Sequence, residues 1–285
     1  ETNPYYINIH DNIRFLEDGK HFLWTSEKDG YNHLYLYNMD GEEVDLITSG
    51  SWDMTDFYGF DEEENTVYFQ AARNNPMDRE VYRASIDGGS LEQLSDKEGW
   101  NAARFSDTYD YFVLIHSTIQ SPPTYTVWET GGEKIRTIQD NQRLREQADK
   151  MNLSKPQFFK CPSADEEYEL NAYMITPPDF NPAKEYPVLM HVYGGPNSQT
   201  VTDRWKGAYY WWFQMLAQKG YIIVSVDNRG TGARGQEFRK CTYMQLGNLE
   251  TQDQIAAAEY LADRPYIDGD NIGIFGWSYG GYMSS

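Results

Sequence analysis

A weak repeat of short aromatic strands runs through the first half of the chain and limits the folds that this half can adopt. One copy contains the strand segment Leu34–Tyr37 and the turn Asp40-Gly41. Later copies turn at Asp87-Gly88 and at Gly131-Gly132, so the period is about 44 to 47 residues. Such a period is typical of four-stranded propeller blades. An open antiparallel sheet or a sandwich is the alternative, because both also have short strands with frequent turns.

The number of copies bears on how much of a propeller the chain holds. About two and a half to three copies precede residue 145, whereas a closed propeller has at least four blades. We therefore expect residues 1–145 to be the last blades of a larger propeller. The polar stretch 139–147 ends the repeat and is interpreted as a link or short helix between domains.

The pattern changes after residue 146 to alternating strands and helices. A hairpin from 156–160 and 168–175 is followed by strand 187–192, helix 208–218, strand 221–226, helix 250–262 and strand 271–275. Apolar strands separated by helices indicate a parallel sheet covered on both faces. In the last helix, one face contains the apolar residues Ile255, Ala258, Leu261 and Ala262. The second domain is therefore predicted to be α/β.

Charge and cysteine content exclude several classes of partner and cofactor. The chain has 24 Lys and Arg against 44 Asp and Glu, a net charge of −20. Such a surface repels phosphate backbones, so neither nucleic acid nor an anionic membrane is expected as a partner. No apolar run approaches the roughly 20 residues of a membrane-spanning helix, so no membrane contact is expected from this segment. Cys161 and Cys241 lack metal-ligand spacing and are interpreted as buried thiols, and we expect no metal and no cofactor.

The strand at 271–275 runs directly into Gly276-Trp277-Ser278-Tyr279-Gly280, which fits the pattern G-x-S-x-G. The bare pattern is weak, since it arises by chance in roughly one such sequence in ten. A nucleophile elbow also needs a buried strand before the serine and small residues two positions to either side, because its turn packs backbone against backbone. Both requirements are met here, so Ser278 is the candidate nucleophile. The alternative is a glycine-rich turn without reactivity.

A serine that attacks a carbonyl generates an oxyanion, which needs preorganised hydrogen-bond donors. One donor should be the backbone N–H of Tyr279, the residue after the nucleophile. The second normally comes from a loop after an earlier strand, and here that loop begins with Tyr193-Gly194-Gly195. Either the phenol of Tyr193 or a glycine N–H could serve. The alternative is that Tyr193 is a strand-end aromatic residue with its hydroxyl in water.

Three segments resemble the dipeptidyl peptidase IV branch of the prolyl oligopeptidase family: 191–199 (HVYGGPNSQ), 226–232 (VDNRGTG) and 276–282 (GWSYGGY). The resemblance covers residues 155–285 well, and the repeat at 20–140 agrees with the end of that family's propeller. It implies a mixed fold class. Residues 1–145 would be all-β blades of a partial β-propeller, and residues 146–285 the N-terminal half of an α/β-hydrolase catalytic domain with a mostly parallel sheet.

The same resemblance implies roles for individual residues. Ser278 would be the nucleophile, Tyr193 the hydroxyl donor of the oxyanion hole, and Tyr279 both a backbone donor and a wall of the proline pocket. Trp277 would also bind substrate. The implied activity is that of a serine exopeptidase that releases N-terminal dipeptides with proline or alanine in the second position, through an acyl-enzyme on Ser278.

Several alternatives to this activity stay open. A prolyl tripeptidyl peptidase shares the motifs, and an acylaminoacyl peptidase or esterase on the same scaffold is a more distant relative. From another class, the chain could belong to a catalytically inactive binding protein whose propeller presents an interaction surface. The resemblance further implies peptide substrates with penultimate proline, a homodimer for the full-length protein, and a periplasmic or cell-surface location.

The catalytic triad is incomplete in this sequence. Hydrolases of this fold place the triad in the order Ser, Asp or Glu, and His. All five histidines precede Ser278, so we expect the triad Asp and His beyond residue 285. The resemblance implies that the clamp for the substrate's amino terminus lies before residue 1. The segment alone should not turn over peptides, since a serine without its base is a weak nucleophile. His191, at a strand end, is expected to be structural.

The segment 230–235 is a literal G-x-G-x-x-G, a pattern of dinucleotide-binding folds. Three residues separate it from the preceding strand, and no acidic residue ends a next strand about 20 positions further on, where a ribose would be bound. We therefore expect no nucleotide. The loop is interpreted as a turn over the rim of the active site, with Arg229 paired to a backbone or carboxylate group.

Overall fold

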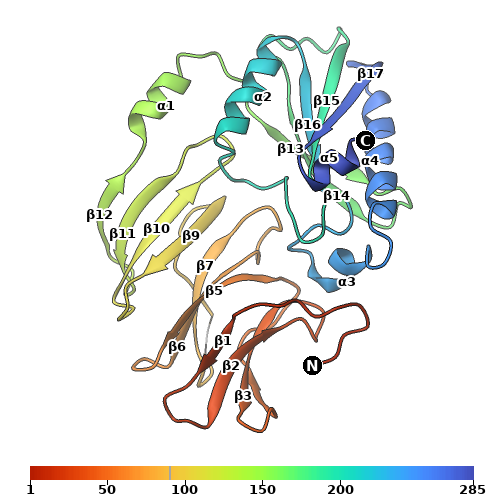
Figure 1. Ribbon diagram of the computed structural model, residues 1–285. Coiled ribbons are helices and arrows are strands. Elements are labelled where there is room, and N and C mark those ends of the chain that lie inside the picture. Colours follow the sequence, from red (N-terminus) through yellow and green to blue (C-terminus); the bar gives the residue numbers. More distant parts are fainter. Residues whose placement is uncertain (90) are drawn as a thin grey trace. The chain divides into compact units, whose positions relative to one another are not determined.

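The computed structural model describes residues 1–89 and 91–285, which divide into two compact units (Figure 1). The first unit consists of residues 1–118, 123–141 and 233–237. The second consists of residues 119–122, 142–232 and 238–285.

Antiparallel four-stranded sheets build the first unit, and the described residues up to 141 form three of them. The first contains β1 (Ile13–Phe15), β2 (His21–Ser26), β3 (His33–Asn38) and β4 (Glu43–Leu46). The second contains β5 (Met54–Asp61), β6 (Thr66–Ala71), β7 (Glu80–Ser85) and β8 (Glu92–Gln93). The third contains β9 (Trp100–Phe105), β10 (Tyr111–Ser117), β11 (Thr124–Glu129) and β12 (Lys134–Gln139). Consecutive strands pair throughout, which confirms the partial propeller.

The glycine turns of the repeat connect the last two strands of each sheet. Gly41, Gly88 and Gly132 have φ values of 82°, 91° and 98°. Residues with a side chain rarely adopt this left-handed region, whereas glycine enters it without a steric penalty, which is why hairpin turns prefer glycine. The backbone conformation of these three turns therefore requires the glycines by which the sequence marks them.

Aromatic rings fill the space inside and between neighbouring sheets of the first unit. Trp52 stacks on Phe69 with ring centroids 6.2 Å apart, and Phe69 stacks on Tyr82 at 5.8 Å. All three side chains are buried. They cluster with Leu23 and Leu34 of the first sheet, so the apolar residues of these strands form a core that two sheets share.

The second unit is an α/β layer structure around one sheet. Its strands are β13 (Gln157–Pro162), β14 (Glu169–Ile175), β15 (Tyr186–Val192), β16 (Ile222–Val226) and β17 (Ile267–Gly276). They lie in the order β13-β14-β16-β15-β17. The β15–β16 and β15–β17 pairings are parallel, while β14 is antiparallel to both β13 and β16. The α/β class is as predicted, with the expected hairpin forming the antiparallel edge.

Helices complete the second half of the chain. They are α1 (Gln142–Ala148), α2 (Ala208–Gln218), α3 (Gly235–Lys240), α4 (Asn248–Ala262) and α5 (Tyr279–Met283). The polar stretch after β12 forms α1, one of the two forms expected for it. Among the described residues, no helix has both the length and the apolar character needed to cross a membrane.

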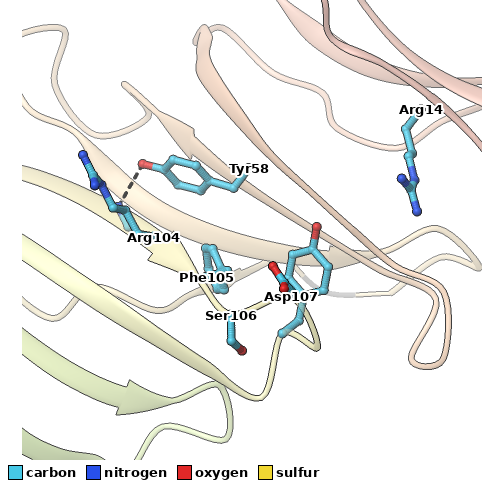
Figure 2. Close-up of a pocket in the computed structure, with 8 residues that line it drawn as sticks. Arg14, Tyr58, Arg104, Phe105, Ser106 and Asp107 are labelled. Atoms are coloured by element: carbon cyan, nitrogen blue, oxygen red, sulfur yellow. Dashed lines mark hydrogen bonds between the residues drawn. The ribbon is translucent and has the colours of Figure 1, made fainter.

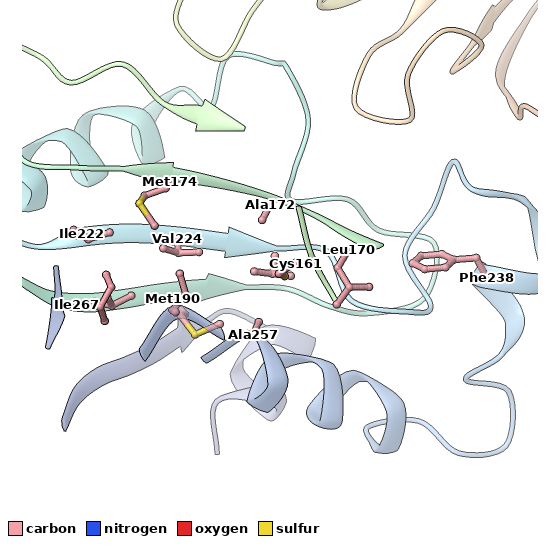
Figure 3. Close-up of a cluster of buried hydrophobic side chains, with 13 residues drawn as sticks. Cys161, Leu170, Ala172, Met174, Met190, Ile222, Val224, Phe238, Ala257 and Ile267 are labelled. Carbon is pink, nitrogen blue, oxygen red and sulfur yellow. The ribbon is translucent and has the colours of Figure 1, made fainter. Parts of the chain in front are cut away.

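The core of the second unit lies between the sheet and α4 (Figure 3). Val224 of β16 and Met190 of β15 pack with Leu170 of β14 and with Ala257 of α4. Cys161 belongs to this cluster as a free buried thiol, as predicted. Cys241 is also free but only half-buried, so the prediction of a buried thiol was wrong for this residue.

The face that α4 buries differs from the apolar face that its sequence shows. Leu261 is buried, but Ile255 is 54% exposed. The remaining buried side chains include Glu250, Asp253 and Gln254. The first half of the buried face is polar because buried polar groups at the end of β16 need partners there, whereas Ala257 and Leu261 in the second half belong to the apolar core. Hydrophobic periodicity alone does not detect such a face.

The two adjacent glycines of the last hairpin turn provide a matched test of the backbone requirement. We expect Gly132→Ala to destabilise the protein by about 1–2 kcal/mol, because its φ is in the left-handed region. Gly131 lies outside that region and a Cβ there would meet no atom within 4 Å. Gly131→Ala should therefore be neutral or stabilising by up to about 1 kcal/mol. Equilibrium unfolding in urea measures both, and equal effects would contradict the assignment.

Candidate active site

The turn between β17 and α5 has the geometry of a nucleophile elbow. Ser278 adopts φ 56° and ψ −117°, a combination that residues with side chains rarely adopt and that stores local strain. A Cβ atom at Gly276 would overlap backbone atoms of Gly280 and Val192, and one at Gly280 would overlap the backbone of Val192. The turn therefore requires glycine at both positions. Ser278 itself is exposed.

The strand register brings the Tyr193 loop to the same sheet edge as this turn. β15 and β17 are parallel, and Val192, the last residue of β15, pairs with Gly276, the last residue of β17. The two strands therefore end at the same level of the sheet. The ring centroids of Tyr193 and Tyr279 are 6.2 Å apart. Tyr193 is 37% exposed. The structure thus places the three sequence-predicted residues Tyr193, Ser278 and Tyr279 close together.

Two buried residues at the end of β16 hold the loop that follows Tyr193. Nδ2 of Asn228 donates to the carbonyl oxygen of Gly194 at 3.0 Å. The Asp227 carboxylate accepts hydrogen bonds from the backbone N–H groups of Thr200 (2.8 Å) and Val201 (3.1 Å). Burial raises the pKa of Asp227, while these donors favour its charged form. Sequence reasoning did not select either residue, although both lie directly after an apolar strand.

Lys206 also forms hydrogen bonds with the segment that follows Tyr193. Its Nζ donates to the carbonyl oxygen of Thr200 at 2.7 Å and to the hydroxyl of Thr202 at 2.6 Å. Burial lowers the pKa of Lys206 to about 8, and the carboxylate of Asp227 opposes that shift. The segment after Tyr193 is therefore tied at several backbone positions, which restricts where the loop can move.

The substrate-binding candidates Trp277 and Tyr279 differ in their surroundings. Trp277 is 76% exposed. The hydroxyl of Tyr279 donates to the buried carboxylate of Glu250 at 2.8 Å. Burial, reinforced by that carboxylate, raises the pKa of Tyr279 well above its usual value. Sequence reasoning missed Glu250, because no local pattern pairs it with a residue 29 positions away.

His191 lies among aromatic rings. It pairs in register with Phe275, and its ring centroid is 5.1 Å from those of Tyr209 and Phe213 of α2. Its Nδ1 is 3.3 Å from the hydroxyl oxygen of Ser225. Burial lowers the pKa of His191 to about 4, with Lys206 adding to the shift. The ring is therefore neutral at pH 7.

The glycine motif at 230–235 has its backbone donors occupied by the protein. The N–H of Gly230 donates to the carbonyl oxygen of Phe238, and that of Gly232 donates to the carbonyl oxygen of Ser198, both at 3.0 Å. A phosphate-binding loop must instead direct free N–H groups at its ligand. The arrangement therefore gives no support to nucleotide binding.

Arg229 has the carboxylate partner that was predicted for it. Its Nη2 lies 2.8 Å from Oδ1 of the fully buried Asp253, and its backbone N–H donates to Oδ2 at 2.9 Å. Its Nη1 contacts Asp165. This ion pair joins the loop after β16 to the middle of α4.

A hollow of about 460 Å³ lies in the first unit, beside β9 and the turn after it (Figure 2). Its lining includes Tyr58, whose hydroxyl accepts a hydrogen bond from the N–H of Ala103 at 3.1 Å. The hydroxyl of Ser106 accepts from the N–H of Tyr111 at 3.2 Å. These polar groups serve the propeller sheets, so we place the candidate active site at the elbow. No cluster of three or more potential metal ligands occurs among residues 1–89 and 91–285.

Comparison with known proteins adds independent findings. Residues 1–123 match the model of the dipeptidyl peptidase IV N-terminal region, and residues 207–285 match that of the prolyl oligopeptidase family. A probable dipeptidyl peptidase 4 of Aspergillus flavus is 35% identical over 268 residues, which cover 93% of this chain and 35% of the relative. A probable dipeptidyl-aminopeptidase B of Emericella nidulans is 37% identical over 270 residues, 92% of this chain and 29% of the relative.

Solved structures agree with these matches. The crystal structure of Porphyromonas gingivalis dipeptidyl peptidase 4 superposes with a TM-score of 0.93 at 42% identity, covering 100% of this chain and 40% of that one. A putative dipeptidyl aminopeptidase IV from Bacteroides ovatus gives 0.87 at 28% identity, covering 99% of this chain and 42% of that one. The chain thus spans about a third of the length of the curated relatives described above.

The depressed pKa of His191 predicts a contribution to acid sensitivity. Between its ordinary pKa of 6.5 and the folded value of about 4, the unfolded state binds the extra proton. Stability should therefore fall as the pH falls through this window, with a slope from this residue of up to about 1.4 kcal/mol per pH unit. Urea unfolding at a series of pH values measures the slope. His191→Gln should reduce it, and an unchanged slope in the variant would contradict the assignment.

Proposed function

The chain belongs to the dipeptidyl peptidase IV branch of the prolyl oligopeptidase family, and from this we propose that the full-length protein is a serine exopeptidase. It would release N-terminal dipeptides with proline or alanine in the second position. The observation that carries the proposal is the strained, exposed Ser278 beside the Tyr193 loop at the sheet edge. In the full-length protein, residues 1–145 would be the last blades of the propeller and residues 146–285 the N-terminal half of the catalytic domain.

The reaction begins at Ser278. Its Oγ attacks the carbonyl carbon of the substrate's second residue, while its proton passes to a histidine base. The five histidines of this chain all precede the serine, whereas the order of the fold places the base after it, so that base would come from outside residues 1–285. The C–N bond then breaks, and the leaving amine takes the proton. Water hydrolyses the acyl-enzyme and releases the dipeptide.

The negative charge that develops on the carbonyl oxygen needs donors that are already in place. The backbone N–H of Tyr279 follows the nucleophile and is one donor, and the phenol of Tyr193 is the second. The register of β15 with β17 and the hydrogen bond from Asn228 to Gly194 support this assignment, because they fix the loop from which the phenol projects.

The proposed substrate preference relies on the apolar surface beside the serine. The ring of Tyr279 would form one wall of the pocket for proline or alanine, and the exposed indole of Trp277 would lie against the substrate. No metal or cofactor takes part in this scheme. Release of tripeptides instead of dipeptides would favour the prolyl tripeptidyl alternative.

The nucleophile can be tested directly in the full-length protein. We expect release of a dipeptide from a peptide with penultimate proline, and labelling of Ser278 by a fluorophosphonate probe. Ser278→Ala should abolish labelling and lower kcat by a factor on the order of 10⁶, because the acyl-enzyme cannot form. Mass spectrometry of the products and of the labelled peptide gives the readout. A protein that folds but neither labels nor releases peptides would favour the inactive binding protein.

The oxyanion donor is tested by removing a single hydroxyl. Tyr193→Phe should lower kcat about 10²–10³-fold with little change in KM, because the hydroxyl acts on charge that develops only in the transition state. Tyr221→Phe is a matched control, since Tyr221 has a similar exposure, 40% against 37%. It lies directly before the first residue of β16, whereas Tyr193 directly follows the last residue of β15. Equal kinetics for the two variants would remove Tyr193 from the mechanism.

A further inference from the structure

A fully buried carboxylate, that of Glu250, lies in the first turn of α4. Burying a charged group is costly unless hydrogen bonds replace the lost water. One oxygen of Glu250 meets this requirement locally: the backbone N–H of Gly247 donates to Oε2 at 3.0 Å. An acidic group in the first turn also interacts favourably with the helix dipole. Helix capping therefore explains the hydrogen bond of one of the two carboxylate oxygens.

The second carboxylate oxygen of Glu250 accepts a hydrogen bond from a residue outside α4. Oε1 accepts the hydrogen bond from the Tyr279 hydroxyl at 2.8 Å. A carboxylate can only accept, so the phenol must donate its proton to it. The hydroxyl of Tyr279 therefore donates its proton to α4 and cannot donate it to a substrate.

The ring of Tyr279 is held from other sides as well. Tyr282 packs against it edge to face at a centroid distance of 5.6 Å. A Cβ atom at Gly195 would lie 3.1 Å from Cγ of Tyr279, so the ring passes close to the Tyr193 loop. With its hydroxyl bonded to Glu250, the ring of Tyr279 has only its carbon atoms left to contact a substrate bound beside Ser278.

We propose that Glu250 is a positioning residue that keeps the pocket beside Ser278 apolar, by holding the Tyr279 hydroxyl away from the substrate. The inference rests on the proposed function, because it concerns the same pocket. A site that offers an uncommitted hydroxyl favours a substrate that can hydrogen-bond to it, whereas a site lined by carbon favours an apolar side chain. Glu250 would thus contribute to the preference for proline over a polar residue such as serine in the second position.

The substitution Glu250→Gln separates this role from helix capping. The N–H of Gly247 still needs an acceptor, so the carboxamide oxygen stays there and its NH₂ group faces Tyr279. The phenol oxygen then accepts, and its own proton becomes available to a substrate. The ratio of kcat/KM for penultimate proline over penultimate serine should fall about tenfold in the full-length enzyme, the size of one hydrogen bond.

A second substitution supplies the decisive control. In the Glu250→Gln background, Tyr279→Phe removes the released hydroxyl and should restore the proline-to-serine ratio to within about twofold of the wild type. Tyr282→Phe is the matched control, because it removes a hydroxyl from the neighbouring ring of the same helix and should restore nothing. Restoration by Tyr279→Phe alone supports the proposal. An unchanged ratio in Glu250→Gln, or restoration by both substitutions, overturns it.

Two further measurements keep the test informative. Tyr279→Phe in the wild-type background should leave the ratio within about twofold, and a larger fall would mean that the hydroxyl already contacts substrate, which overturns the inference even where Glu250→Gln does not fold. The wild-type enzyme tests the proposed function separately. Failure of the wild type to release any dipeptide refutes the proposed activity, whereas normal release with an unchanged ratio in Glu250→Gln refutes only the role of Glu250.

Discussion

The contact between the backbone of the Ser278 turn and the end of β15 is the constraint on which the candidate site depends. Gly276 and Gly280 lie so close to Val192 that no side chain fits at either position. This approach allows Ser278 to keep its strained conformation and to stay exposed while both flanking elements are packed. It also ties the position of the serine to β15, and therefore to the loop that begins at Tyr193.

Buried polar groups, rather than apolar packing, hold the segments around that contact. Asn228 bonds the loop after β15, Arg229 bonds Asp253 of α4, and Glu250 of α4 bonds Tyr279. The apolar core packs the other parts of β14, β15 and β16 against the same helix. Such directional bonds specify positions more narrowly than apolar contacts do, because a hydrogen bond restricts both distance and angle.

The sequence predicted what is local and periodic. The turn glycines, the apolar strands and the serine between glycines each leave a short-range pattern, so the propeller sheets, the α/β order and the elbow could be predicted. It did not reveal the polar face of α4, because Glu250, Asp253 and Gln254 resemble surface residues until their partners are known. Arg229, Asn228 and Tyr279, which bond these three side chains, lie 24 to 29 positions away, on segments that only the folded chain brings together.

The energetics of these buried groups link the stability of the second unit to the geometry of the candidate site. Removing one partner of a buried ion pair such as Arg229–Asp253 costs about 3–5 kcal/mol, because the other charge is left unpaired. That is a large share of the roughly 5–15 kcal/mol by which a domain is stable. Asp253 and Glu250 lie on the same face of α4, so the helix that bears the stabilising pair also positions Tyr279. A substitution that shifts α4 to improve packing would therefore also displace the wall beside Ser278.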